Sequence, residues 1–225
     1  MCKIIATFIA TTALALSVSS TASATVYTDE AAWRAAVGGV FAVETFDSLG
    51  AGSDVNSLAN LGISFDPLND GTQPTVQPYS STGGIPRSGP NNLLNDRDFT
   101  LPGRGPISVR PIDSNDFIFA LGLWNVGGDD QLQLAFYDAT DTLIELVVSA
   151  VASGFFGIVN DNGAKRAEVS FVGGNGYAPT DDWQTATREI FDPSVPEIPI
   201  PAALPLFLSG LAAGGFLTRR KKKTS

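Results

Sequence analysis

Polar and apolar residues alternate along residues 131–136, the pattern of a strand with one face in a protein core. An apolar run at 142–148 follows the short polar segment 138–141, so the two runs predict a β-hairpin with a tight turn. Short strands separated by turn residues favour an all-β fold, specifically a β-sandwich. The other predicted strands lie at residues 40–46, 62–65, 107–112, 116–124, 154–159, 166–172 and 182–187.

One segment near the start has a helical pattern instead. Residues 28–39 predict a short helix with Thr28 as its N-cap and Gly38 as its stop. Trp33 and Val37 lie four residues apart, so they would share one face of this helix.

The segment 66–90 has neither pattern. It is rich in Pro, Gly and Ser and predicts a long irregular stretch. We therefore expect one β-sandwich domain at residues 25–192, with a single short helix at its start and a long loop after its second strand.

The composition excludes several kinds of active site. The 225 residues include no histidine and one cysteine, Cys2. Catalytic sites with an imidazole base, and metal sites built from His or Cys, are therefore excluded. Carboxylates remain available for chemistry, but among 23 acidic residues some pair will always have the separation that glycoside hydrolysis needs. We expect no enzyme activity.

The N-terminus has the pattern of a secretory signal at residues 1–24. Lys3 gives a positive start, residues 4–18 are apolar, and Ala22 and Ala24 form a small-x-small cleavage site. Cleavage after Ala24 would remove the cysteine, so the exported domain would have to be stable without disulfides.

The C-terminus predicts an anchor. Residues 193–201 form a Pro-rich, extended spacer, and the apolar run that follows predicts a transmembrane helix at 202–218, about 24 Å long over its 16 apolar residues. The basic tail 219–225 is expected on the cytoplasmic side, with the N-terminal domain outside. The cations are Arg219, Arg220, Lys221, Lys222 and Lys223.

This tail resembles the PEP-CTERM class of bacterial sorting signals, in its VPLPA variant, because a motif, a short apolar helix and a basic cluster occur in order. The motif residues are Ile198, Pro199, Ile200, Pro201 and Ala202. They differ from the VPLPA motif at two positions, since Ile198 replaces its Val and Ile200 replaces its Leu. The resemblance implies processing by an exosortase, a membrane protease, in a Gram-negative cell that makes exopolysaccharide. It also implies an inner-membrane intermediate and a final place at the cell surface or in the extracellular matrix.

The body is similar to the mature regions of such proteins, which look like jelly-roll sandwiches related to carbohydrate-binding modules and discoidin-like domains. The matching pieces lie at residues 27–38, 44–47, 61–65, 132–138 and 154–158, with a late acidic pair at 181–182. The resemblance implies a jelly-roll-like fold.

Without its ends the chain is strongly acidic. Residues 25–197 hold all 23 acidic residues and eight of the 14 basic ones, which gives a net charge of −15. This charge argues against nucleic acid and anionic lipid surfaces as partners of the domain.

Four carboxylates are candidate calcium ligands. Glu44 lies near the end of the first predicted strand and Asp47 follows that strand, while Asp181 directly precedes the last predicted strand and Asp182 begins it. Calcium takes oxygen ligands only, and the jelly-roll resemblance implies a structural calcium that joins the first and last strands. The alternative is that these are solvated turn residues.

Two tyrosines in polar, Gly-rich segments, Tyr79 and Tyr177, are candidates for stacking on sugar rings. The alternative is that both are ordinary surface residues. We therefore expect an exported, anchored and exosortase-processed surface or matrix protein with exopolysaccharide as its ligand. A secreted carboxylate-dependent polysaccharide hydrolase or lyase, and a surface adhesion module, remain as alternatives.

Overall fold

The structure is a computed structural model that describes residues 24–38, 42–96, 105–128, 131–151, 153–174 and 176–188. Nearly all of the predicted signal peptide lies outside these residues. So do the predicted spacer, sorting motif, transmembrane helix and basic tail.

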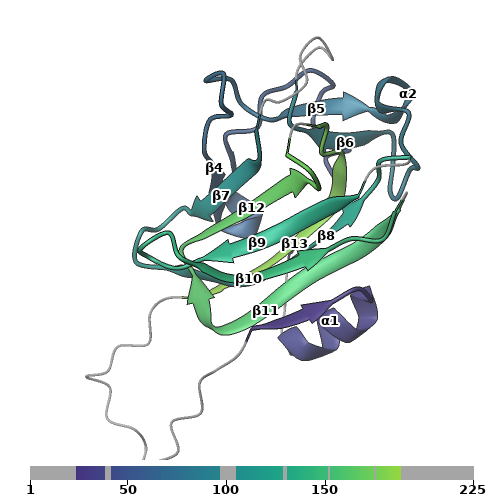
Figure 1. The fold of residues 1–225 in the computed structure, drawn as a ribbon. Helices are drawn as coiled ribbons and strands as arrows, with labels where there is room; N and C mark the ends of the chain where they lie inside the picture. The colour runs from purple at the N-terminus through teal and green to yellow at the C-terminus, as the bar shows by residue number, and fades with distance from the viewer. Residues whose placement is uncertain are drawn as a thin grey trace, which may run out of the picture. The chain divides into compact units, whose positions relative to one another are not determined.

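Most of the described residues belong to two antiparallel sheets and the segments that connect their strands (Figure 1). The first sheet contains, in spatial order, β1 (Thr25–Tyr27), β11 (Gly154–Ala164), β8 (Phe117–Asn125), β13 (Thr180–Arg188), β6 (Asn91–Leu94) and β5 (Thr75–Pro78), and β2 (Ala42–Glu44) also pairs with β13. The second contains β10 (Leu143–Val148), β9 (Leu132–Tyr137), β12 (Arg166–Phe171), β7 (Ile107–Pro111), β4 (Ile63–Phe65) and β3 (Ser57–Leu58). The predicted all-β class is confirmed.

The core lies between the two sheets, because alternate side chains of both face inward. In β9, Leu132, Leu134 and Phe136 are fully buried, as the alternation at residues 131–136 predicts. They belong to the same apolar cluster as Leu121 of β8 and Phe156 of β11, which come from the other sheet.

Each of the nine predicted strands overlaps an observed one, and the predicted hairpin is β9–β10. Its turn is closed by Asp138, whose Oδ1 accepts hydrogen bonds from the backbone N–H of Thr140 at 2.7 Å and of Thr142 at 2.9 Å. Asp141 has a φ of 58°, a left-handed conformation that aspartate tolerates in turns.

The prediction of a long irregular segment at 66–90 is wrong. It contains β5 and a short helix, α2 (Tyr79–Thr82). β5 is a short strand with buried polar residues, so its sequence shows no alternation. Residues 52–55 lie along its outer edge, where the Gly52 N–H donates to the Val76 carbonyl at 2.7 Å and the Val76 N–H donates to the Ser53 carbonyl at 2.9 Å. β1, β3 and β6, and the 3₁₀ helix Ala59–Leu61, are likewise too short to leave a periodic pattern.

The predicted N-terminal helix is confirmed as α1 (Glu30–Val37), but its N-cap is Asp29 and not Thr28. Asp29 Oδ1 accepts the backbone N–H of Ala32 at 2.7 Å, while the residues before it already belong to β1. Gly38 ends the helix with a φ of 65°, as expected.

This correction gives a direct test. Asp29→Ala is expected to lower the free energy of unfolding by about 1 kcal/mol, since it removes the acceptor for one unpaired helix N–H. Thr28→Ala is the matched control and is expected to change it by less than about 0.5 kcal/mol. Urea denaturation of the two variants measures both, and the opposite ranking would restore Thr28 as the cap.

Two glycines allow α1 to lie close to the first sheet. A Cβ on Gly157 of β11 would come within 2.8 Å of the Trp33 ring, and one on Gly122 of β8 within 3.0 Å. Trp33 is fully buried in this space, and its indole N–H donates to the Ile158 carbonyl at 3.3 Å. The small residues therefore fix where the helix covers the sheet.

Candidate functional site

A cluster of polar side chains around the buried Asp181 lies where α2, the segment after it and the start of β13 meet. We call it the Asp181 cluster and define it as Tyr79, Arg87, Ser88, Asp181 and Asp182. Asp181 is fully buried, and Tyr79 and Asp182 are 7% and 9% exposed. Three residues that the sequence analysis selected thus come together here.

The Asp181 carboxylate accepts four hydrogen bonds. Its Oδ2 receives the Tyr79 hydroxyl at 2.6 Å, the Ser88 hydroxyl at 3.0 Å and the Ser88 backbone N–H at 3.2 Å. Its Oδ1 receives the backbone N–H of Asp182 at 2.7 Å. Burial raises the pKa of Asp181 to about 6, an effect that the Tyr79 bond opposes and the Asp182 charge reinforces. Burial also raises the pKa of Tyr79 well above its usual range.

Asp182 has a left-handed backbone, with a φ of 47°. The conformation coincides with a break in the pairing of β13 with β8 between Asp181 and Gln184. It brings the Asp182 carboxylate to the Ser88 hydroxyl at 2.6 Å and to the Arg87 guanidinium at 3.4 Å. The strain of this backbone is offset by contacts that attach the 87–88 segment to β13.

Glu30, at the start of α1, connects the helix to the cluster. It accepts hydrogen bonds from Arg87 at 3.0 Å, from the side-chain amide of Gln184 at 2.7 Å and from the indole of Trp124 at 3.3 Å. Burial works to raise the pKa of Glu30, but hydrogen bonds from Gln184 and from Arg34 (at 2.6 Å) outweigh it and hold the pKa below its usual value. Arg87 also lies over the Trp124 ring, 4.1 Å from its centre.

The other predicted site residues lie outside this cluster, although Glu44 is the cross-strand partner of Trp183 in β13 and the Asp47 carboxylate lies against Gly89. Glu44 accepts the backbone N–H of Phe46 at 2.9 Å and the Asn60 amide at 3.2 Å, and Asp47 accepts the backbone N–H of Asn91 at 3.3 Å. Tyr177 is half-buried just before β13. Within the part of the chain that the structure describes, no three acidic side chains are grouped to hold a metal ion.

These placements bear on both site predictions. A calcium bound by Asp181 and Asp182 would have to replace the protein donors from Tyr79, Ser88 and Arg87 that already satisfy them, and the calcium site stays a prediction. The expectation that Tyr79 lies in a loop is wrong, because it begins α2 and its hydroxyl bonds to the buried Asp181. Its ring is covered and is not a stacking platform.

The sequence analysis missed Arg87 and Ser88. A signal was present, since Arg87 is the only charged residue between Asp70 and Asp96. A lone charge in a long uncharged segment suggests a specific ion-pair partner, but only the fold identifies that partner as Glu30 and Asp182.

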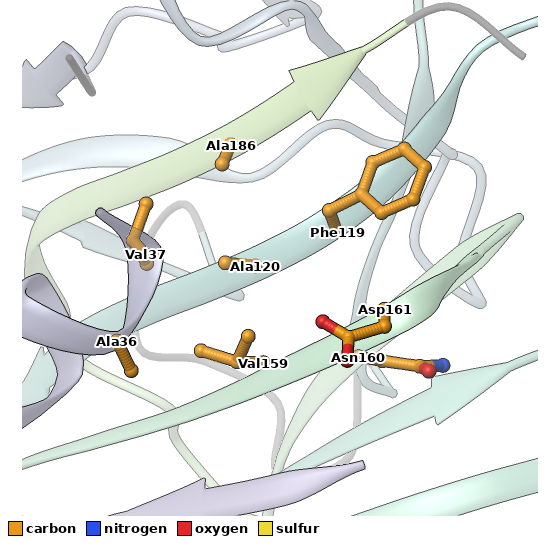
Figure 2. Close-up of a pocket in the computed structure, with 8 residues that line it drawn as sticks. All are labelled: Ala36, Val37, Phe119, Ala120, Val159, Asn160, Asp161 and Ala186. Carbon is orange, nitrogen blue, oxygen red and sulfur yellow. The ribbon is translucent and has the colours of Figure 1, made fainter. Parts of the chain in front are cut away.

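A separate pocket of about 200 Å³ lies on the outer face of the first sheet, beside the end of α1 (Figure 2). Ala36 and Val37 of the helix form one wall, and Phe119 and Asp161 lie on the far side. The floor is formed by Ala120, Val159 and Ala186, from three neighbouring strands.

The comparisons with known proteins identify no family. No family model matches the chain, and no curated protein matches it. One solved structure that is similar is the enzymatically active domain of tailspike protein 4 of bacteriophage CBA120, at 14% identity and a TM-score of 0.23 over 67% of this chain. The match spans 19% of the tailspike chain. At this TM-score neither its fold nor its activity is transferred.

Proposed function

We propose that this chain is an exported bacterial protein of the cell surface or extracellular matrix, with a non-catalytic jelly-roll domain that contacts polysaccharide. The strand order supports the jelly roll. Strands β6, β13, β8 and β11 are neighbours in one sheet, and β7, β12, β9 and β10 are neighbours in the other. Eight strands divided in this way form two Greek keys, the arrangement of many lectin domains.

The observation that carries the export and sorting proposal is the order of features in the tail. A Pro-containing motif at 198–202 precedes an apolar run, and five cations follow it. This order supports anchoring with the domain outside, followed by cleavage by an exosortase-type protease. The tail lies outside the described residues, and within the described ranges up to residue 188 no helix has the length and apolar character to cross a bilayer.

The mass of the surface-located protein tests this proposal. We expect a form that begins at Thr25 and ends near the motif 198–202. Replacing Pro199 and Pro201 by alanine is expected to leave the C-terminal residues on the protein and keep it in the membrane fraction. Replacing Pro193 and Pro196 in the spacer is the matched control and is expected to leave processing intact. A surface protein that still ends at Ser225 would contradict exosortase processing.

One observation favours the alternative of a carboxylate-dependent hydrolase. A carboxyl group with a pKa near 6, as burial gives Asp181, has the acidity of a general acid. However, a general acid must reach the glycosidic oxygen, and Asp181 is fully buried with four protein donors on its oxygens. These contacts favour a structural role, so we propose a binding domain and not an enzyme.

A further inference from the structure

We propose that the pocket beside the end of α1 binds one uncharged pyranose unit of a polysaccharide. The inference deepens the proposed matrix function and rests on it for the class of ligand. The proposal rests on four features of the pocket: an irregularity in each of two neighbouring strands, a floor of small residues and an acidic side chain at the rim.

The first irregularity turns an aromatic ring toward the pocket. In the pairing of β8 with β13, Ala120 lies opposite Ala186 and Ile118 lies opposite Thr187, so Phe119 is an extra residue in β8. A β-bulge of this kind changes the direction of a side chain. As a result Phe119 lines the same outer pocket as Ala120 (Figure 2). Ile118, by contrast, is fully buried in the core.

The second irregularity presents a carboxylate. β11 pairs with β8 at Val159 and again at Ala164, and the residues between them leave the regular pairing. The Asn160 side chain stabilises this irregular segment. Its amide N–H donates to the Gly163 carbonyl at 3.3 Å, and its side-chain oxygen accepts the backbone N–H of Asn162 at 3.1 Å. Asn160 is therefore a positioning residue, and the exposed Asp161 stands at the pocket rim.

The floor leaves room for a ring. Val159, Ala120 and Ala186 are direct cross-strand partners on one row of the sheet, and two of the three have only a methyl side chain. α1 ends at Val37 and does not cover this row completely. The volume of about 200 Å³ is smaller than the roughly 300–1,000 Å³ of pockets for drug-sized ligands, which suits a single sugar unit.

The chemistry of the walls selects the ligand. An aromatic ring and an apolar floor fit the C–H face of a pyranose, while a carboxylate accepts hydrogen bonds from its hydroxyl groups. Among the described residues, no hydrogen bond or ion pair engages the Asp161 carboxylate. The net charge of −15 over residues 25–197 opposes anionic polysaccharides. An uncharged sugar unit fits the apolar surface, donates hydrogen bonds to the Asp161 carboxylate and is not repelled by the negative net charge.

Calorimetric titration of the full chain with cellohexaose, maltohexaose and chitohexaose tests the proposal, in a detergent without a sugar head group. We expect at least one of these uncharged hexasaccharides to bind. Phe119→Ala and Asp161→Ala are each expected to weaken binding about tenfold, which corresponds to about 1.4 kcal/mol. Ala36→Leu, at an exposed helix position on the pocket wall, is expected to block binding by filling the space.

Glu145→Ala removes a half-buried carboxylate from β10 of the other sheet, and as the matched control it is expected to bind like the unmodified chain. Thermal unfolding of each variant identifies any that lose the fold, and Ala36→Leu removes no group from the sheet. Absence of binding to all three sugars, or binding that none of the pocket variants weakens, would overturn the proposal. Chitosan hexamer is titrated as a cationic comparison, and binding of this hexamer alone would overturn the proposal of an uncharged ligand. None of these outcomes alters the mass of the processed protein, so the sorting proposal is tested separately.

Discussion

Trp33→Ala is expected to lower the free energy of unfolding by about 3–5 kcal/mol, the range for truncating a buried tryptophan. Trp33 is fully buried, and its ring centre lies 5.8 Å from that of Phe155. Eight residues are too few for a helix to persist in water without tertiary contacts. The position of α1 on the sheet, and with it one wall of the pocket, therefore depends on this side chain.

Urea denaturation measures the loss, and the helical contribution to far-ultraviolet circular dichroism reports whether α1 is retained. Val26→Ala is the control, because Val26 lies in β1, the strand that directly precedes α1 in the chain. Its side chain is 45% exposed, so we expect a change within about 0.5 kcal/mol. A loss below 1 kcal/mol in Trp33→Ala would show that other contacts hold the helix in place.

Raising the pH from 5 to 7.5 is expected to lower the free energy of unfolding by about 1.4 kcal/mol through Asp181 alone. Burial raises the pKa of Asp181 to about 6, above its ordinary value of 3.8. The folded state thus binds this proton more tightly than the unfolded state. The stabilisation is complete below pH 3.8 and is lost as the pH rises through about 6. Glu30 titrates below this window, because its pKa is lowered.

Asp181→Asn separates this effect from the pH dependence of the remaining acidic residues. The variant cannot titrate at this position, so its free energy of unfolding should fall about 1.4 kcal/mol less than that of the unmodified chain over the same pH range. Asp161→Asn removes an exposed carboxylate and is expected to retain the original slope. Equal slopes for the unmodified chain and Asp181→Asn would mean that hydrogen bonds from Tyr79 and Ser88 cancel the effect of burial.

Much of the fold could be predicted from local patterns. The alternation at residues 131–136 directly encodes which side chains of β9 face the core, and the polar segment after it encodes the hairpin turn. Helix α1 was predictable because its stop, Gly38, and its buried residue, Trp33, are local features. The N-cap was assigned one residue too early, since Thr28 and Asp29 are both good caps and only the path of β1 distinguishes them.

The candidate sites were predictable only in part. The sequence singled out Tyr79, Asp181 and Asp182, but it grouped the two aspartates with Glu44 and Asp47, whose carboxylates bind other backbone and amide groups. Spacing along a chain does not reveal that residues 93 positions apart, Ser88 and Asp181, are in contact. β6 likewise leaves no periodic signal, because all four of its residues are buried, and it pairs with β13 at Thr180, next to Asp181.

By itself the sequence determined the strand periodicity, the helix and the absence of imidazole chemistry, because each depends on residue type and local spacing. The tertiary structure alone decided that Arg87 pairs with Glu30 and Asp182, and that a bulge turns Phe119 to the outer face beside Asp161. Register shifts are set by how neighbouring strands pair, and pairing partners come from distant segments. A pocket formed where two such shifts meet is therefore a property of the assembled sheet and of no single stretch of sequence.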